Sequence, residues 1–275
     1  MKPTSGKIRQ LTPGDVRLAL QMSSNCGWNQ TADDWHLLLD LAPEGSLCIE
    51  IDGVVAATTT LLPYGDRLGW IGMVLTHPDF RRRGFATRLL TLAIERADQV
   101  GIRTLKLDAT EQGQPLYSSL GFRAEQSVER WFHPAMKSAK QAPNTGAADL
   151  SSWFARDTSA FGADRSKLLP RLALRGGCVT SAGGYVLTRP GNRTAYLGPG
   201  VATTPVSARE LFGRSIQVPA ATGWSWDLFP ENRNAVALAT ELGFAPQRRL
   251  MRMVRGEELR GKDEFVYAIA GFELG

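Results

Sequence analysis

Residues 78–87 read Pro-Asp-Phe-Arg-Arg-Arg-Gly-Phe-Ala-Thr, and they separate a predicted strand from a predicted helix. Gly84 and Ala86 stand just before the helix, where several backbone N–H groups have no partner inside the helix. Those N–H groups and the helix dipole attract an anion, and small residues let a ligand approach the backbone closely. A solvated run of arginines is the alternative, but cations at a helix N-terminus oppose the dipole. The stretch therefore predicts a site for phosphate or pyrophosphate.

The segments around this turn alternate between strand and helix patterns. Asp52-Gly53 is a typical two-residue hairpin turn. In 104–109 apolar residues alternate with Lys106 and Asp108, as expected of a strand. Thr31 is a candidate N-cap, and Gly101 a candidate helix C-cap. The expected helices are 15–24, one opening after Thr31, 86–100 and a short one ending at Gly121; the expected strands are 46–51, 54–62, 70–76, 104–109 and 122–131. This order predicts an α/β layer with a mixed sheet.

The turn resembles motif A of the GCN5-related N-acetyltransferases (GNAT), whose pattern is (Gln/Arg)-x-x-Gly-x-(Gly/Ala); here it reads Arg81-Arg82-Arg83-Gly84-Phe85-Ala86. A Tyr-x-x-x-Gly-Phe sequence starting at Tyr117 and the order of the flanking elements also agree with that family. The resemblance covers most of residues 5–135. It implies acetyl-CoA as co-substrate, no metal, and direct acetyl transfer to a primary amine without a covalent acyl-enzyme.

The resemblance also implies roles for individual residues. The N–H of Val74 would donate to the thioester oxygen, next to a β-bulge that Gly72 would tolerate. Tyr117 would protonate the departing thiolate. Thr110 stands where many relatives carry an asparagine that holds the pantetheine arm. The residues expected to bind the cofactor are Val74, Leu75, Thr76, Arg81, Arg82, Arg83, Gly84, Phe85, Ala86, Thr87 and Thr110.

The base that takes the proton of the incoming ammonium is not assigned by the sequence. Several family members place a glutamate four residues before the position of Val74, and here that residue is Trp70. Glu111, Glu50 and His77 are candidates, and a chain of water molecules is a further option.

The second half of the chain repeats the first. The Gly-Phe pair that ends at Phe122 recurs at Phe244, 122 residues later, behind a similar helix. A small, polar segment lies between the two halves. We therefore expect a catalytic domain over 1–138, a linker over 139–148, and a degenerate copy over 149–275. The predicted fold class is α/β (α+β), with two tandem GNAT-like domains, each a mixed, mostly antiparallel sheet flanked by helices.

The second copy lacks the residues that carry the chemistry. No Arg-x-x-Gly-x-Ala turn follows its strand over 195–201, and Ala239 stands at the tyrosine position. We expect this copy to be catalytically silent and to wall the acceptor pocket. Candidates for substrate binding are Trp226 and Asp227, together with Trp28 and Asn29 in a loop between helices. The alternative for Trp226 is a place in the core, with Asp227 as a charge at a strand end.

Composition limits the other classes of function. The net charge of the 275 residues is +5, and no basic block indicates nucleic-acid binding. The three scattered cysteines favour neither disulfides nor a zinc site. No apolar stretch is long enough to cross a membrane, so we expect a cytoplasmic protein.

An acyl-CoA sensor or interaction protein without catalysis is the alternative function. The acceptor is open between a small amine, an amino acid, an aminoglycoside-like compound and a peptide or protein amino group. The oligomeric state is not readable from the sequence.

Overall fold

The computed structural model describes residues 6–135, 150–217, 220 and 222–275, so the expected linker over 139–148 lies outside the described residues. The helices are α1 (Val16–Asn25), α2 (Ala32–Leu41), α3 (Phe85–Gln99), α4 (Gln114–Ser119), α5 (Phe154–Phe161), α6 (Leu169–Ala173), α7 (Pro205–Ser215) and α8 (Arg233–Glu241). The strands are β1 (Lys7–Gln10), β2 (Leu47–Ile51), β3 (Val54–Tyr64), β4 (Leu68–Thr76), β5 (Thr104–Ala109), β6 (Arg123–His133), β7 (Gly177–Ser181), β8 (Gly184–Arg189), β9 (Ala195–Ala202), β10 (Trp224–Leu228), β11 (Ala245–Gly256) and β12 (Val266–Ala268).

Local signals explain the elements of the first half. Thr31 caps α2: its side chain accepts from the N–H of Asp34, whose carboxylate in turn accepts from the N–H of Thr31. Asp52 and Gly53 have φ angles of 50° and 78°, as the tight turn of the β2–β3 hairpin requires. Gly101 follows α3 with a φ of 78°. The predicted mixed α/β fold is confirmed, with a largely antiparallel sheet.

Helices cover both faces of the sheet. On one face α3 packs its Leu90 and Ala93 against Leu105 and Leu107 of β5. On the other face α1 and α2 pack in one cluster with Trp70 of β4, and residues of the second half join this cluster. Because the second half covers this face, the side chains of Lys106 and Asp108 on β5 are buried. Lys106 is buried and pairs with Glu125 at 2.9 Å.

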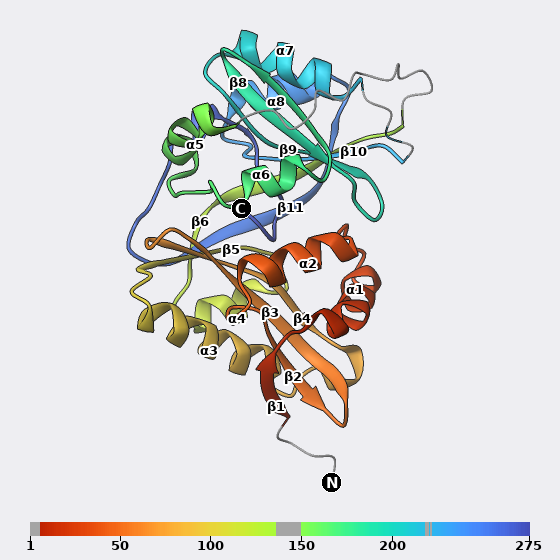
Figure 1. Cartoon of the computed structure of the whole chain (residues 1–275), viewed down its shortest axis with the longest axis vertical. Helices are drawn as coiled ribbons and strands as arrows, with labels where there is room; N and C mark the ends of the chain where they lie inside the picture. The colour runs from red at the N-terminus through yellow and green to blue at the C-terminus, as the bar shows by residue number, and fades with distance from the viewer. Residues whose placement is uncertain (1–5, 136–149, 218–219, 221) are drawn as a thin grey trace.

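In the described residues the two halves interdigitate in a single twelve-stranded sheet. Eleven of its strands follow the order β1-β2-β3-β4-β5-β11-β6-β10-β9-β8-β7, and β12 pairs with β9 outside this order. Strand β11 of the second half lies between β5 and β6, which both belong to the first half (Figure 1). Strand β6 in turn lies between β11 and β10, which both belong to the second half. Each half therefore contributes its last long strand to the sheet of the other.

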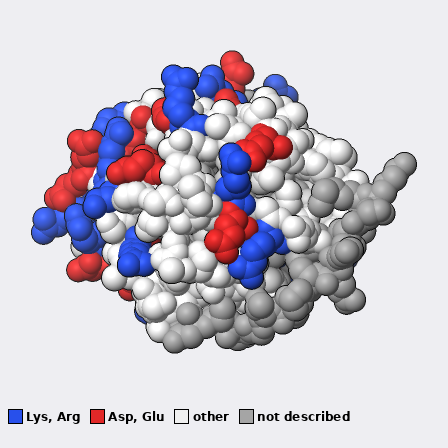
Figure 2. Space-filling model, turned by 90° about the horizontal axis from the view of Figure 1, so that it is seen from above, with Lys and Arg blue, Asp and Glu red and all other residues white. Residues whose placement is uncertain are grey.

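The second half has its own core between the sheet and the helices α7 and α8. Phe212 of α7 stacks on Trp226 of β10 with ring centroids 4.5 Å apart, and Phe244 meets the same indole edge-on at 5.2 Å. Strand β12 leaves the main order of the sheet and pairs antiparallel with β9. On the face seen in Figure 2, basic and acidic side chains are interspersed, and neither sign forms a continuous patch.

Candidate active site

Strands β4 and β5 pair only at one end and then diverge. Their parallel ladder joins Leu68–Trp70 to Thr104–Lys106, whereas the strands run on to Thr76 and Ala109. Beyond this ladder no strand of the described residues pairs with the β5-facing edge of β4. This opens a wedge in the sheet whose exposed backbone groups can pair with an extended ligand.

A β-bulge lies in β4 at the mouth of the wedge. Met73 and Val74 together oppose the single residue Thr59 of β3, because Gly72 pairs with Thr60 and Leu75 with Thr58. Met73 has a φ of 49°, and its carbonyl accepts a hydrogen bond of 2.7 Å from the Thr58 hydroxyl. The bulge predicted next to Gly72 is therefore present.

The arginine-rich turn ends in an uncapped helix N-terminus. Gly84 precedes α3 with a φ of 75°, and no side chain in the described part of the chain caps the helix. A Cβ on Gly84 would have none of the described atoms within 4 Å, so the space in front of the first turn of α3 is open. Arg81 and Arg82 are exposed, and Arg82 has a φ of 59°. The Arg83 guanidinium lies over the rings of Phe80 and Phe85, at 5.4 and 5.1 Å.

This turn has the chemistry of an anion site. No side chain of the described residues caps the first N–H groups of α3, the space at Gly84 is open, and the exposed Arg81 and Arg82 stand just before them in sequence. A pyrophosphate group and an extended arm reaching into the wedge fit these features together.

Tyr117 lies on α4 with its ring against Phe122, at 6.1 Å between centroids. Burial raises its pKa to about 12, so the phenol keeps its proton at neutral pH. Tyr117 can therefore donate a proton. The hydroxyl oxygen of Thr110 accepts a hydrogen bond of 3.2 Å from the N–H of Gly113 next to the start of α4, and its O–H can still donate to a ligand.

The residues suggested for substrate binding have partners within the chain. Trp226 is fully buried in the core of the second half, and its Nε1 donates to the carbonyl of Tyr267. The carboxylate of Asp227 accepts two hydrogen bonds from Arg130, at 2.7 and 2.6 Å. The alternative reading of Trp226, as part of the core, is correct.

The loop between α1 and α2 is fastened to the second half. The side-chain oxygen of Asn29 accepts from the backbone N–H groups of Arg193 and Thr194, and its Nδ2 donates to the carbonyl of Thr194. Asn29 is buried, and Trp28 is half-buried. Asn29 therefore holds the α1–α2 loop against the second half.

The three candidate bases, Glu50, His77 and Glu111, have different surroundings. Glu50 accepts a hydrogen bond from Arg9 across β1 and β2. The Nδ1 of His77 accepts from the N–H of Asp79 and so caps the short helical turn after β4. Glu111 is exposed. Sequence reasoning missed a buried carboxylate beside β4, Glu273, because the segment that carries it lies 200 residues further along the chain.

The second half has the same wedge, but the chain itself fills it. The ladder between β9 and β10 ends at Leu197 and Trp226. Beyond that point β12 takes the free edge of β9, with Val266 opposite Val201 and Ala268 opposite Gly200. The N–H of Ile269 donates to the carbonyl of Asp227 on β10 and closes the other side of the wedge.

The bulge in β9 and the start of α7 also lack the free N–H groups of their counterparts, the bulge in β4 and the start of α3. In β9 the bulge falls at Gly198 and Pro199, so a proline without an N–H stands where β4 has Val74. The side chain of Thr204 caps α7 by accepting from the N–H of Ser207. Asn232, the N-cap residue of α8, donates from Nδ2 to the carbonyl of Val266 at the start of β12.

Two acetyltransferase family models match the chain. The model described as "Acetyltransferase (GNAT) family" matches residues 18–122, and the one described as "Acetyltransferase (GNAT) domain" matches residues 154–268. The chain belongs to the GNAT acetyltransferase family, in a tandem form. The predicted repeat is thereby confirmed.

Individual relatives agree with this assignment. The GNAT chain is similar to the uncharacterized N-acetyltransferase YitH of Bacillus subtilis, with 31% identity over 127 residues, and the match spans 44% of each protein. The crystal structure of an assigned acetyltransferase of Pyrococcus horikoshii gives a TM-score of 0.84 at 21% identity. The match covers 100% of this chain and 98% of that one. A GCN5-related N-acetyltransferase of Sphaerobacter thermophilus gives a TM-score of 0.63 at 15% identity, with coverage of 95% of this chain and 99% of that one. These two structures show a shared fold.

The described residues of this GNAT protein contain neither a metal-binding cluster nor a membrane-spanning helix. No group of three or more His, Cys, Asp or Glu side chains in the described part of the chain is arranged to hold a metal ion. Within the same residues no helix has the length and apolar character needed to cross a membrane.

Proposed function

We propose that the first half is an acetyl-CoA-dependent N-acetyltransferase that transfers the acetyl group directly to a primary amine. The observation that carries the proposal is the open, uncapped N-terminus of α3 behind Gly84, beside the wedge between β4 and β5. The helix N-terminus suits the pyrophosphate, and the free edge of β4 suits the pantetheine arm.

The proposed chemistry uses groups of the wedge. The N–H of Val74 donates to the thioester oxygen as it gains charge, next to the bulge at Met73. Leu75 and Thr76 present their backbone to the pantetheine arm, and Tyr117 gives its proton to the departing sulfur. Because the amine attacks the thioester itself, no nucleophilic side chain is needed.

The second half is proposed to bind no acetyl-CoA. Strand β12 fills its wedge, Pro199 removes the N–H donor, and Thr204 satisfies the start of α7. Asn232 holds β12 through the carbonyl of Val266. We therefore assign catalysis to the domain over 1–138 and a supporting role to 149–275, with one cofactor site per chain.

Calorimetry with acetyl-CoA on Gly84→Glu tests this proposal. The new carboxylate would stand at the phosphate position, and binding should weaken at least about 100-fold. Gly53→Glu is the matched control, because Gly53 also has a positive φ of 78° and no atom within 4 Å of its Cβ position. The wild type and this control should bind one acetyl-CoA per chain.

The outcomes separate the alternatives. Equal binding by Gly84→Glu and wild type would remove the proposed phosphate site, and two acetyl-CoA per chain would contradict the filled second wedge. Binding without acetyl transfer to any amine would favour the acyl-CoA sensor.

A further inference from the structure

The segment Ile269–Gly275 runs from the second half onto the face of β4 opposite α3. Trp70 of β4 donates from Nε1 to the carbonyl of Phe272 at 3.0 Å, and Tyr64 of β3 donates to the carbonyl of Leu274. A Cβ placed on Gly72 would lie 2.9 Å from the carbonyl oxygen of Glu273 and 3.3 Å from its Cα. Glu273 is therefore held against β4, two residues before the bulge position Val74.

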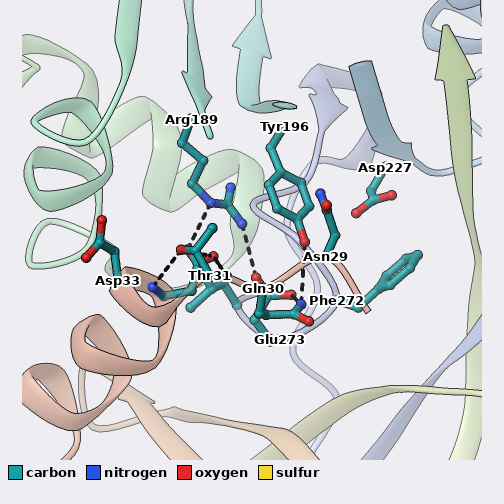
Figure 3. Close-up of polar contacts among 12 residues, drawn as sticks. Asn29, Gln30, Thr31, Asp33, Arg189, Tyr196, Asp227, Phe272 and Glu273 are labelled. Atoms are coloured by element: carbon teal, nitrogen blue, oxygen red, sulfur yellow. Dashed lines mark hydrogen bonds and ion pairs between the residues drawn. The ribbon is translucent and has the colours of Figure 1, made fainter. Parts of the chain in front are cut away.

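The carboxylate of Glu273 joins the two halves of the molecule. It accepts a hydrogen bond of 2.8 Å from Nε2 of Gln30, in the loop between α1 and α2, and one of 3.0 Å from Nη2 of Arg189 on β8 (Figure 3). Arg189 also pairs with Asp34 at 3.4 Å, and Tyr196 accepts a long bond from Gln30. The Glu273 side chain is only 2% exposed.

Three buried polar atoms around Glu273 lack a hydrogen-bond partner among the described residues: Oε1 of Gln30, Nη1 of Arg189 and Oγ1 of Thr60. The first two belong to the side chains that bind Glu273, and Thr60 Oγ1 lies 3.2 Å from the Cβ position of Gly72. Buried polar groups without partners are rare in folded proteins, and a bound water, an ion or a catalytic role accounts for most of them. Of these three atoms, Oε1 of Gln30 and Oγ1 of Thr60 can accept a hydrogen bond from a ligand.

Charged side chains of both signs are buried around Glu273. They are Asp34, Arg130, Arg189, Asp227 and Glu273 itself, and the half-buried Arg248 of β11 lies opposite Arg130. Burial raises the pKa of Glu273, and the charge of Arg189 opposes that rise. A carboxyl group with a raised pKa is better suited to accept a proton than an ordinary exposed carboxylate.

We infer that Glu273 binds the ammonium group of the acceptor and takes its proton, directly or through one water molecule. This inference rests on the proposed function, and it supplies the base that the sequence does not assign. Gln30 Oε1 and Thr60 Oγ1 are further acceptors for the ammonium. The acceptor is thus an amine that is cationic at neutral pH, such as an alkylamine.

The protons balance in this scheme. The ammonium loses one proton to Glu273, which releases it to solvent, and the amine nitrogen then bonds to the acetyl carbon while the C–S bond breaks. The nitrogen loses its second proton as the amide forms. This proton replaces the phenol proton that Tyr117 gives to the departing sulfur.

Rates measured with two small amines distinguish a catalytic base from a residue that only supports the structure. Ethylamine is protonated at neutral pH, whereas methoxyamine is neutral there and needs no base before attack. In Glu273→Gln we expect kcat/KM for ethylamine to fall about 100-fold or more, and that for methoxyamine to change less than about threefold. Glu273→Asp keeps the carboxylate and should regain part of the ethylamine rate.

Two controls distinguish loss of the base from effects on folding and on cofactor binding. Asp157→Asn removes an equally buried carboxylate, paired with Arg165, and should leave the ratio of the two amines unchanged. Acetyl-CoA affinity, measured by calorimetry, should be the same in wild type and Glu273→Gln, and its loss in wild type would instead overturn the proposed function. Equal losses for both amines, or no transfer to ethylamine by wild type that binds acetyl-CoA, would overturn the role of Glu273.

Discussion

Two aspartate–arginine pairs occupy equivalent places in the two halves. Asp108 of β5 accepts from Arg252 of β11 at 2.8 and 3.0 Å, and Asp227 of β10 accepts from Arg130 of β6. Each arginine stands eight residues after the phenylalanine of a Gly-Phe pair, and each reaches an aspartate of the other half. The sequence shows the repeat of these residues, but it does not show which arginine meets which aspartate.

Removing Arg252 should be costly. In Arg252→Met the buried Asp108 loses its partner, and we expect the free energy of unfolding to fall by about 3–5 kcal/mol. Burial already raises the pKa of Asp108, so the loss should shrink as the pH is lowered and the carboxyl takes up a proton. Urea unfolding at several pH values measures this. Arg209→Met, in an exposed pair with Glu241, should change stability by less than about 1 kcal/mol, and equal effects of the two variants would contradict the argument.

Tyr117→Phe tests the proposed acid. We expect kcat to fall about 100-fold while acetyl-CoA affinity stays within about twofold, because only proton donation is lost. Since burial raises the pKa of Tyr117 to about 12, the wild-type rate should not drop through ionisation of this phenol between pH 7 and 10. Ser118→Ala, the exposed neighbour on α4, is the control. A kcat unchanged by Tyr117→Phe would remove the tyrosine from the mechanism.

At the scale of elements, the sequence predicts what local signals determine. The cap at Thr31, the turn at Asp52-Gly53 and the arginine-rich turn before α3 are each set by residues within one short segment. Strand β12 could not be predicted because it is short and its position depends on a distant part of the chain. It pairs with β9, about 70 residues earlier in the sequence, where β9 diverges from β10. Glu273 escapes for the same reason, since its partners come from the α1–α2 loop and β8.

For the whole molecule, the interdigitated sheet makes the two halves depend on each other. Without β11, the edges of β5 and β6 that it covers are free to pair with other chains. Residues 1–138 produced alone should therefore aggregate or self-associate, and addition of residues 145–275 should restore a 1:1 complex that binds acetyl-CoA. Size-exclusion chromatography and calorimetry measure both. A monomeric 1–138 fragment with the acetyl-CoA affinity of the full chain would contradict this.

The position of β11 also sets the order of events during synthesis. Strand β6 ends at His133, but the strand that must enter between β5 and β6 ends only at Gly256. At about 5–20 residues per second, the ribosome needs roughly 6–25 s to make the chain between these points. For that time the nascent first half has an unfilled gap between β5 and β6 of its sheet, which a chaperone can shield until β11 emerges.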